Sequence, residues 1–165
     1  MRPQDLLVPA PGGLCCNRGG FHIDPLRPVA RALITHAHSD HARLGHDMVL
    51  ATQETLDMMR LRYGDNFAGH TQTIRYGETL RLNDVTVSFH PAGHVLGSAQ
   101  IAMTCNGLRI VASGDYKDVP DPTCEPFEVV PCDVFITEAT FGLPVFRHPD
   151  AMREVRKLLD SVRLF

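Results

Sequence analysis

One short stretch, Leu33-Ile34-Thr35-His36-Ala37-His38-Ser39-Asp40-His41, constrains this chain more than any other. Four potential metal ligands follow one another there, directly after a short apolar run. Side chains two positions apart point the same way in an extended segment, so His36 and His38 can reach one cation. Asp40 and His41 follow as the chain turns, and a carboxylate beside an imidazole suits a second, neighbouring cation. A merely histidine-rich, solvated loop is the alternative interpretation, but the ordered H-x-H-x-D-H spacing favours a metal site.

The composition is that of an ordinary globular chain. Its 165 residues are 44% hydrophobic and 21% charged, which fits one domain with one core. The formal net charge of −3 excludes a globally basic surface, although one basic face is still compatible with it. No run approaches the roughly 18 apolar residues of a membrane helix, and the first residues lack the apolar core of a signal peptide. Five cysteines, an odd number, argue against a complete disulfide framework. We therefore expect a cytoplasmic protein with free thiols and no membrane association.

Apolar periodicity predicts a strand-rich chain with helices inserted. Thr52 is expected to cap a helix that Gly64 ends, and Asn106-Gly107 is expected to close a hairpin. We expect His46 to be solvated and residues 67–70 to form a loop. The expected strands are 6–8, 14–16, 21–24, 32–35, 48–51, 73–76, 79–82, 85–89, 98–105, 108–112 and 134–137, and the expected helices are 42–46, 52–62 and 150–162. This order predicts an α+β fold, with a mostly antiparallel sheet covered by helices rather than a doubly wound parallel sheet.

Two later strand ends carry further candidate ligands. His94 follows one strand between Gly93 and Gly97, and Asp115 follows the next hairpin strand directly after Gly114. Polar residues flanked by glycine are common in turns, so each motif alone is a weak signal. Combined with the first cluster, they give His36, His38 and His94 for one ion, Asp40 and His41 for a second, and Asp115 as a bridge. Two divalent ions about 3.5–4 Å apart are suited to phosphate-ester hydrolysis.

This combination of motifs resembles the metallo-β-lactamase superfamily of binuclear metal hydrolases. The segment Thr137-Glu138-Ala139-Thr140-Phe141-Gly142 is similar to the first acidic motif of the β-CASP nucleases, a branch that processes DNA or RNA. The segments Pro91-Ala92-Gly93-His94-Val95-Leu96-Gly97-Ser98-Ala99 and Ser113-Gly114-Asp115-Tyr116-Lys117 resemble the bacterial ligase-associated DNA exonucleases, which are also described as similar to messenger-RNA 3′-end-processing factors.

The resemblance implies an αββα fold and two divalent ions, zinc or manganese. It also implies a metal-activated hydroxide that attacks a phosphodiester. Asp40 would hold the second ion and orient that hydroxide, and Glu138 would stand beside the centre as an acid. The alternative for Glu138 is an acidic residue that merely caps a turn. The implied partners are nucleic acid, DNA rather than RNA, together with an ATP-dependent DNA ligase and a helicase, in DNA repair. The preference for DNA depends on the resemblance alone.

Family members continue beyond this length, so the resemblance implies that residues 1–165 are the N-terminal half of a metallo-β-lactamase domain, ending near the start of the β-CASP insertion. The missing parts would supply the remaining ligand of the second ion. His148 is the one histidine after Asp115, and the pattern does not make it a ligand.

Two other functions remain open at this point. The same metals could serve a thioester or lactone hydrolase of the superfamily. The chain could also be an inactive remnant that binds metal without turnover.

Overall fold

The computed structural model describes residues 1–146 and 149–164 of the chain. Within these residues, strands are far more numerous than helices, as the sequence predicts. The elements are a 3₁₀ turn (Pro3–Asp5), β1 (Val8–Ala10), β2 (Gly13–Cys16), β3 (Phe21–Ile23), β4 (Arg31–Leu33), β5 (His46–Ala51), α1 (Gln53–Tyr63), β6 (Ala68–Thr73), β7 (Thr79–Leu82), β8 (Val85–Pro91), β9 (Ala99–Cys105), β10 (Leu108–Ala112), β11 (Val134–Ile136) and α2 (Ala151–Leu164).

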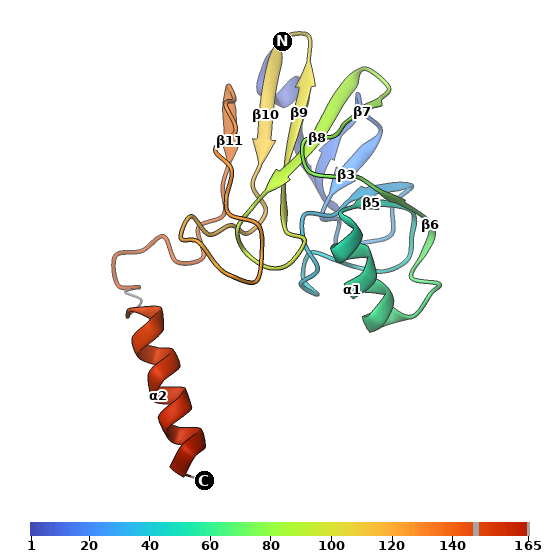
Figure 1. Cartoon of the computed structure of the whole chain (residues 1–165). Helices are drawn as coiled ribbons and strands as arrows, with labels where there is room; N and C mark the ends of the chain where they lie inside the picture. Colours follow the sequence, from blue (N-terminus) through green and yellow to red (C-terminus); the bar gives the residue numbers. More distant parts are fainter. Residues whose placement is uncertain (147–148, 165) are drawn as a thin grey trace.

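The strands form two sheets packed against each other (Figure 1). The first sheet has the order β1-β2-β3-β4-β5-β6, and the second has the order β11-β10-β9-β8-β7. Strands β1 to β3 pair antiparallel, whereas β3 to β6 pair parallel. The second sheet is antiparallel except for the parallel β10–β11 pair. The α+β class is therefore confirmed, but as two mixed sheets rather than one mostly antiparallel sheet.

The main core lies between the two sheets. Phe21, Leu33 and Leu50 contribute from the first sheet, and Phe89 and Ile101 contribute from the second, each with at most 1% of its surface exposed. Alternate residues of β8, namely Val85, Val87 and Phe89, lie in this core, which is the pattern of a strand with one face on the core. This burial fixes the two sheets relative to each other and hence the positions of the loops at their ends.

The outer face of the first sheet is covered by α1. Leu56 and Met59 from the helix pack against Ala32 and Val49 of the sheet. The Thr52 side chain accepts a hydrogen bond from the Thr55 amide at the start of α1, and Gly64 ends the helix with φ +83°. Both predicted helix ends are confirmed.

The outer face of the second sheet is covered differently. Ala102 and Val111 pack against Val130 of the irregular connection that follows β10. Prolines hold this connection out of regular structure because they cannot donate a backbone hydrogen bond. The helix-covered sheet of the sequence prediction is thus observed for the first sheet only.

Several local predictions are wrong. Residues 42–45 form an irregular bend rather than a helix. Residues 68–73 form β6, although we expected a loop over 67–70 and a strand over 73–76. His46 is only 1% exposed, whereas we expected it to be solvated. It opens β5, and its Nδ1 accepts a hydrogen bond from the Val29 amide. Strand pairing with β6 therefore overrides the weak local helical pattern.

The last helix, α2, stands away from both sheets (Figure 1), and none of its residues is buried. Its apolar residues, including Leu158 and Leu159, are exposed. Among the helices of residues 1–146 and 149–164, none is both long and apolar enough to cross a membrane.

Candidate metal centre

The first two candidate ligands lie just beyond the end of β4. Ile34 and Thr35 continue the buried strand direction, so the imidazole of His36 is delivered into the protein and is fully buried, while His38 is exposed. A turn follows, in which the Ala42 amide donates to the His38 carbonyl at 2.8 Å. Arg62 of α1 donates to the Ala37 carbonyl at 2.5 Å and so fastens the peptide between the two histidines.

The other two candidate ligands come from the second sheet. His94 lies in the loop between β8 and β9, and Asp115 follows β10. Gly114 precedes Asp115 with φ +58°, and a Cβ there would lie 2.6 Å from the Thr35 Oγ1. This absence of a side chain lets the end of the second sheet approach the end of the first.

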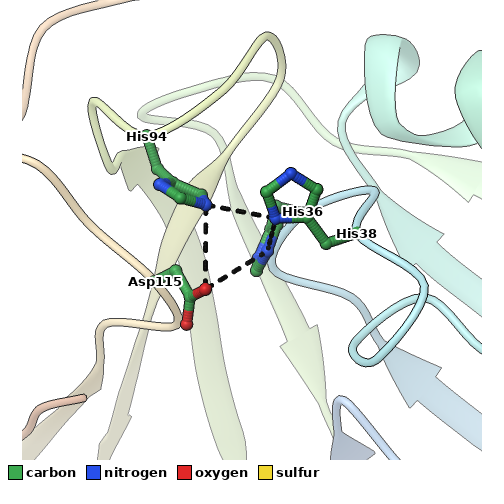
Figure 2. Close-up of side chains that lie close together, drawn as sticks. All are labelled: His36, His38, His94 and Asp115. Carbon is green, nitrogen blue, oxygen red and sulfur yellow. Dashed lines mark hydrogen bonds and ion pairs between the residues drawn. The ribbon is translucent and has the colours of Figure 1, made fainter. Parts of the chain in front are cut away.

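Four donor atoms from these residues point toward one centre (Figure 2). The His38 Nδ1 lies 3.1 Å from the His36 Nε2 and 3.2 Å from the His94 Nε2. The Asp115 Oδ2 lies 3.8 Å from the His36 Nε2 and 3.7 Å from the His94 Nε2. Four ligands bound tetrahedrally at about 2.0–2.1 Å lie about 3.3 Å from each other, so these spacings fit a zinc-like ion. The donor set of three imidazoles and one carboxylate fits the same ion.

A second group of donors adjoins the first. The His41 Nε2 lies 3.4 Å from the Asp115 Oδ1 and 3.8 Å from the Asp40 Oδ2. One oxygen of Asp115 thus faces the first group and the other faces the second, which is the arrangement of a bridging carboxylate. Asp40 has 73% of its side chain exposed, against 22% for His41 and 27% for Asp115. The structure brings all six predicted ligands together, and their roles as ligands remain predictions.

The electrostatic environment favours neutral imidazoles in the first group. Burial, reinforced by the nearby His41, His94 and His38, lowers the pKa of His36 to about 2. Burial also lowers the pKa of His94, although Asp115 opposes it. Neutral imidazole is the form that binds metal, so these histidines need not lose a proton to a cation at neutral pH.

His41 has a different environment. Burial alone would lower the pKa of His41, but the hydrogen bond with Asp24 and the charges of Asp24 and Asp115 outweigh it, so the pKa is raised.

Two supporting residues were not predicted as part of the site. The Asp24 carboxylate accepts hydrogen bonds from the Thr35 amide at 2.8 Å and from the Thr35 hydroxyl at 2.6 Å. It also lies 2.8 Å from the His41 Nδ1. In the sequence, the one available signal was an acidic residue at the end of a strand that neighbours the one leading to His36.

Glu138 lies two residues beyond β11. It lines a solvent-open cavity of about 420 Å³ together with Asp40, His41 and Asp115. Its Oε2 accepts a hydrogen bond from the Thr140 amide at 2.7 Å. Glu138 therefore caps a turn and also lines the candidate site, and its role as an acid remains a prediction. His148 lies outside the described residues.

The family of the chain is shown by its relatives among known proteins, since no family model matches it. The chain is 34% identical to a protein named "Probable DNA ligase" from Opitutus terrae, with 83% of this chain and 13% of that protein aligned. It is 32% identical to "Ribonuclease TTHA0252" from Thermus thermophilus, with 88% of this chain and 39% of that protein aligned. It is 35% identical to "Endoribonuclease ysh1" from Aspergillus fumigatus, with 55% of this chain and 11% of that protein aligned.

Two facing mixed sheets with histidines and a carboxylate converging at their ends define a domain of the metallo-β-lactamase superfamily. Within that superfamily, the chain belongs to the β-CASP branch, as its relatives do. The chain spans between 11% and 39% of the length of the three relatives described above.

Proposed function

We propose that this chain carries the metal centre of a hydrolase that cleaves nucleic-acid phosphodiester bonds. The observation that carries the proposal is the convergence of four donor atoms from two sheets, all within 4.8 Å of one another. The names of the relatives, which include a ribonuclease and an endoribonuclease, support nucleic acid as the substrate class.

We further propose that the site takes two divalent ions, zinc first and manganese as the alternative. The first ion would be held by His36, His38 and His94, and the second by Asp40 and His41, with Asp115 between them. When bound, such a pair lowers the pKa of a coordinated water and neutralises charge on a phosphate.

The roles of the two acids follow from their exposure. Asp40 reaches into solvent beside His41, so its second oxygen is free to accept a proton from an attacking water. Glu138 lines the same cavity and is available as the acid beside the centre. The His41 ring, held by Asp24, stays directed at Asp115.

DNA is the substrate that we propose first, as an exonuclease in DNA repair. The support is the alignment of most of this chain with part of a protein named "Probable DNA ligase". The same observation supports a DNA ligase as partner. An ATP-dependent ligase and a helicase are proposed from the family resemblance alone. RNA processing is a second candidate that the names of two relatives support. The free state of all five cysteines supports a reducing, cytoplasmic compartment.

The test is a panel of labelled substrates offered to protein that has been stripped and reloaded with Zn²⁺ or Mn²⁺. The panel holds single- and double-stranded DNA, RNA of the same sequence, and a thioester and a lactone. We expect cleavage of nucleic acid that a chelator abolishes and that the His36→Ala variant lacks. Cleavage of DNA ends in preference to RNA would support the exonuclease, and preferential RNA cleavage would support the second candidate.

Two results would contradict the proposed function. Hydrolysis of the thioester or lactone with no cleavage of nucleic acid would indicate a small-molecule hydrolase. Binding of one ion or fewer, with no activity above that of the His36→Ala control, would indicate an inactive metal-binding remnant.

A further inference from the structure

The Asp24 carboxylate is linked by hydrogen bonds to one histidine of each candidate metal position. The Asp24 Oδ2 accepts the Thr35 hydroxyl at 2.6 Å and lies 2.8 Å from the His41 Nδ1. The same Thr35 hydroxyl lies 3.1 Å from the His36 Nδ1. His36 belongs to the first donor group and His41 to the second, so one continuous set of hydrogen bonds joins the two groups behind their ligand atoms.

The position of the Thr35 hydroxyl proton determines which ring nitrogen of His36 is protonated. A threonine hydroxyl has one proton, and the short contact assigns it to the ionised carboxylate of Asp24. The hydroxyl oxygen is then an acceptor toward His36, which must carry its own proton on Nδ1. The Nε2 of His36 is left with a lone pair, and this is the atom that faces the donor centre (Figure 2).

The Asp24 carboxylate also determines which ring nitrogen of His41 is protonated. An ionised carboxylate only accepts, so the Nδ1 of His41 must be the protonated nitrogen. The lone pair of the neutral ring then lies on Nε2, which faces the Asp115 Oδ1 at 3.4 Å. Both histidines therefore present the ligand atom that the donor groups need.

Thr35 has no freedom to break this arrangement. It is only 1% exposed, its amide donates to the Asp24 Oδ1, and its carbonyl accepts from the Ala99 amide at 2.7 Å. Gly114 lies against its side chain. Asp24 itself adopts φ +43°, a left-handed conformation that is uncommon for a residue with a side chain. The fold thus holds this uncommon backbone conformation at the residue whose carboxylate contacts His41 directly and His36 through the Thr35 hydroxyl.

We propose that Asp24 and Thr35 form one positioning unit, which fixes the tautomer of one histidine in each metal position. The metal affinity of both positions then depends on the same carboxylate. Asp24 and Thr35 act through His36 and His41 rather than on a substrate. The inference depends on the proposed metal centre for its purpose, but the tautomers themselves are properties of the metal-free chain.

The sharpest test is the Asp24→Asn variant, which keeps the shape of the side chain. The amide oxygen must occupy the Oδ1 position, because the Thr35 amide donates there. The amide NH₂ then occupies the Oδ2 position and donates to the Thr35 hydroxyl and to the His41 Nδ1. Both histidines would carry their proton on Nε2, the wrong nitrogen for the metal.

Ring-nitrogen NMR shifts of the full chain without metal, at a pH where His41 is neutral, report these tautomers directly. We expect Nδ1–H for His36 and His41 in the unaltered protein and Nε2–H for both in the Asp24→Asn variant. Titration with Zn²⁺ should show a loss of affinity of about 10- to 100-fold at both positions, as is typical when a residue that supports a ligand is replaced. The histidine shifts of His38 and His94 report the first position during that titration, and those of His41 report the second.

A second pair of variants keeps the test valid if the Asp24→Asn variant fails to fold. The Thr35→Val variant replaces the hydroxyl with a methyl group of similar size, so we expect the affinity of the first position to fall while His41 keeps its Nδ1 proton. The Thr35→Ser variant should restore the first position. The Asp65→Asn variant, at an exposed residue of similar charge, should change neither tautomer nor affinity.

The proposal is overturned if His36 carries its proton on Nε2 in the unaltered protein, or if the Asp24→Asn and Thr35→Val variants keep the original tautomers and affinities. Failure of the unaltered protein to bind Zn²⁺ would overturn the proposed function instead. The tautomers measured without metal would still decide whether Asp24 and Thr35 act as proposed.

Discussion

At the residue scale, the glycine before Asp115 determines how closely the two sheets approach. Gly114 has φ +58°, and an added Cβ would lie within 2.6–3.0 Å of three atoms of the Thr35 side chain. The site therefore depends on the absence of a side chain as much as on its ligands.

We predict that Gly114→Ala destabilises the protein by roughly 1–3 kcal/mol, from the strained backbone together with the collision. The measurement is urea unfolding. Gly107→Ala is a matched control, because Gly107 has φ +81° with nothing within 4 Å of its added Cβ. Equal losses in the two variants would show that contact with Thr35 has no cost of its own.

Tyr76 gives a second prediction at this scale. Its hydroxyl donates to the Ser98 carbonyl at 2.9 Å, and burial raises the pKa of Tyr76. Above the unfolded tyrosine pKa of about 10, the unfolded chain loses a proton that the native chain keeps, so stability must fall as the pH rises.

Unfolding by urea at a series of alkaline pH values tests this expectation. The Tyr76→Phe variant should lose about 1 kcal/mol near neutral pH, because one of the two hydrogen bonds to the Ser98 carbonyl is lost and only that from the Ala92 amide is kept. Its stability should decline less steeply at alkaline pH. An identical alkaline decline in the variant and the unaltered protein would refute the assignment.

The ligand residues could be predicted from the sequence because the chemistry is local. Three strand ends carry histidine or aspartate next to glycine or in H-x-H-x-D-H spacing, and strand ends gather at a sheet edge. The roles of Asp24 and Thr35 could not be predicted, because they depend on which oxygen meets which nitrogen after the sheets pack. The burial of His46 was missed for the same reason, since nothing local indicates that β6 pairs beside it.

At the scale of elements, the two helices contrast. In α1 the apolar stripe is buried, with Leu56 only 2% exposed, whereas Leu158 of α2 is 64% exposed. Similar apolar spacing in the sequence thus has different consequences in the structure.

We predict that Leu56→Ala costs about 2–5 kcal/mol of stability, because it leaves a cavity between α1 and the first sheet. Leu158→Ala serves as the matched control and should change stability by less than about 0.5 kcal/mol. Chemical denaturation of both variants measures the difference. A cost above about 2 kcal/mol at Leu158 would mean that α2 packs against the sheets in solution.

The strands differ in how far the sequence predicts them. The hairpin across Asn106-Gly107 forms as expected, since both residues adopt positive φ and the flanking strands β9 and β10 pair antiparallel. β6 was placed several residues late because Ala68–Thr73 is almost entirely exposed and carries no apolar alternation. Its parallel pairing with β5, and not its own sequence, makes it a strand.

At the scale of the whole molecule, the candidate site spans both sheets. His36 and His38 extend from the first sheet, whereas His94 and Asp115 extend from the second. A cation held by all four would therefore resist separation of the sheets.

We predict that a chelator lowers the unfolding temperature of metal-loaded protein and that Zn²⁺ restores it. An ion present at 100 times its dissociation constant adds about 2.7 kcal/mol to stability. The Asp115→Asn and His36→Ala variants should show smaller shifts on chelation. An unfolding temperature that is the same with and without the chelator would contradict a metal bridge between the sheets.

The division into two sheets was not predictable from local patterns. Alternation indicates where strands lie, but the parallel pairs β3–β4, β4–β5 and β5–β6 are set by connections that cross over, and their partners are distant in sequence. The fold class followed from the element order and the family resemblance; the strand partners required the tertiary structure.

The equal contribution of the two sheets also bears on synthesis of the chain. A nascent polypeptide that has completed only the first sheet has two of the four donors of the first position, His36 and His38, and tight coordination there must wait until the residues around 94 and 115 have emerged and docked. Metal binding would then be the last step of folding. It would stabilise a domain whose two sheets have already packed together, and it would not initiate their folding.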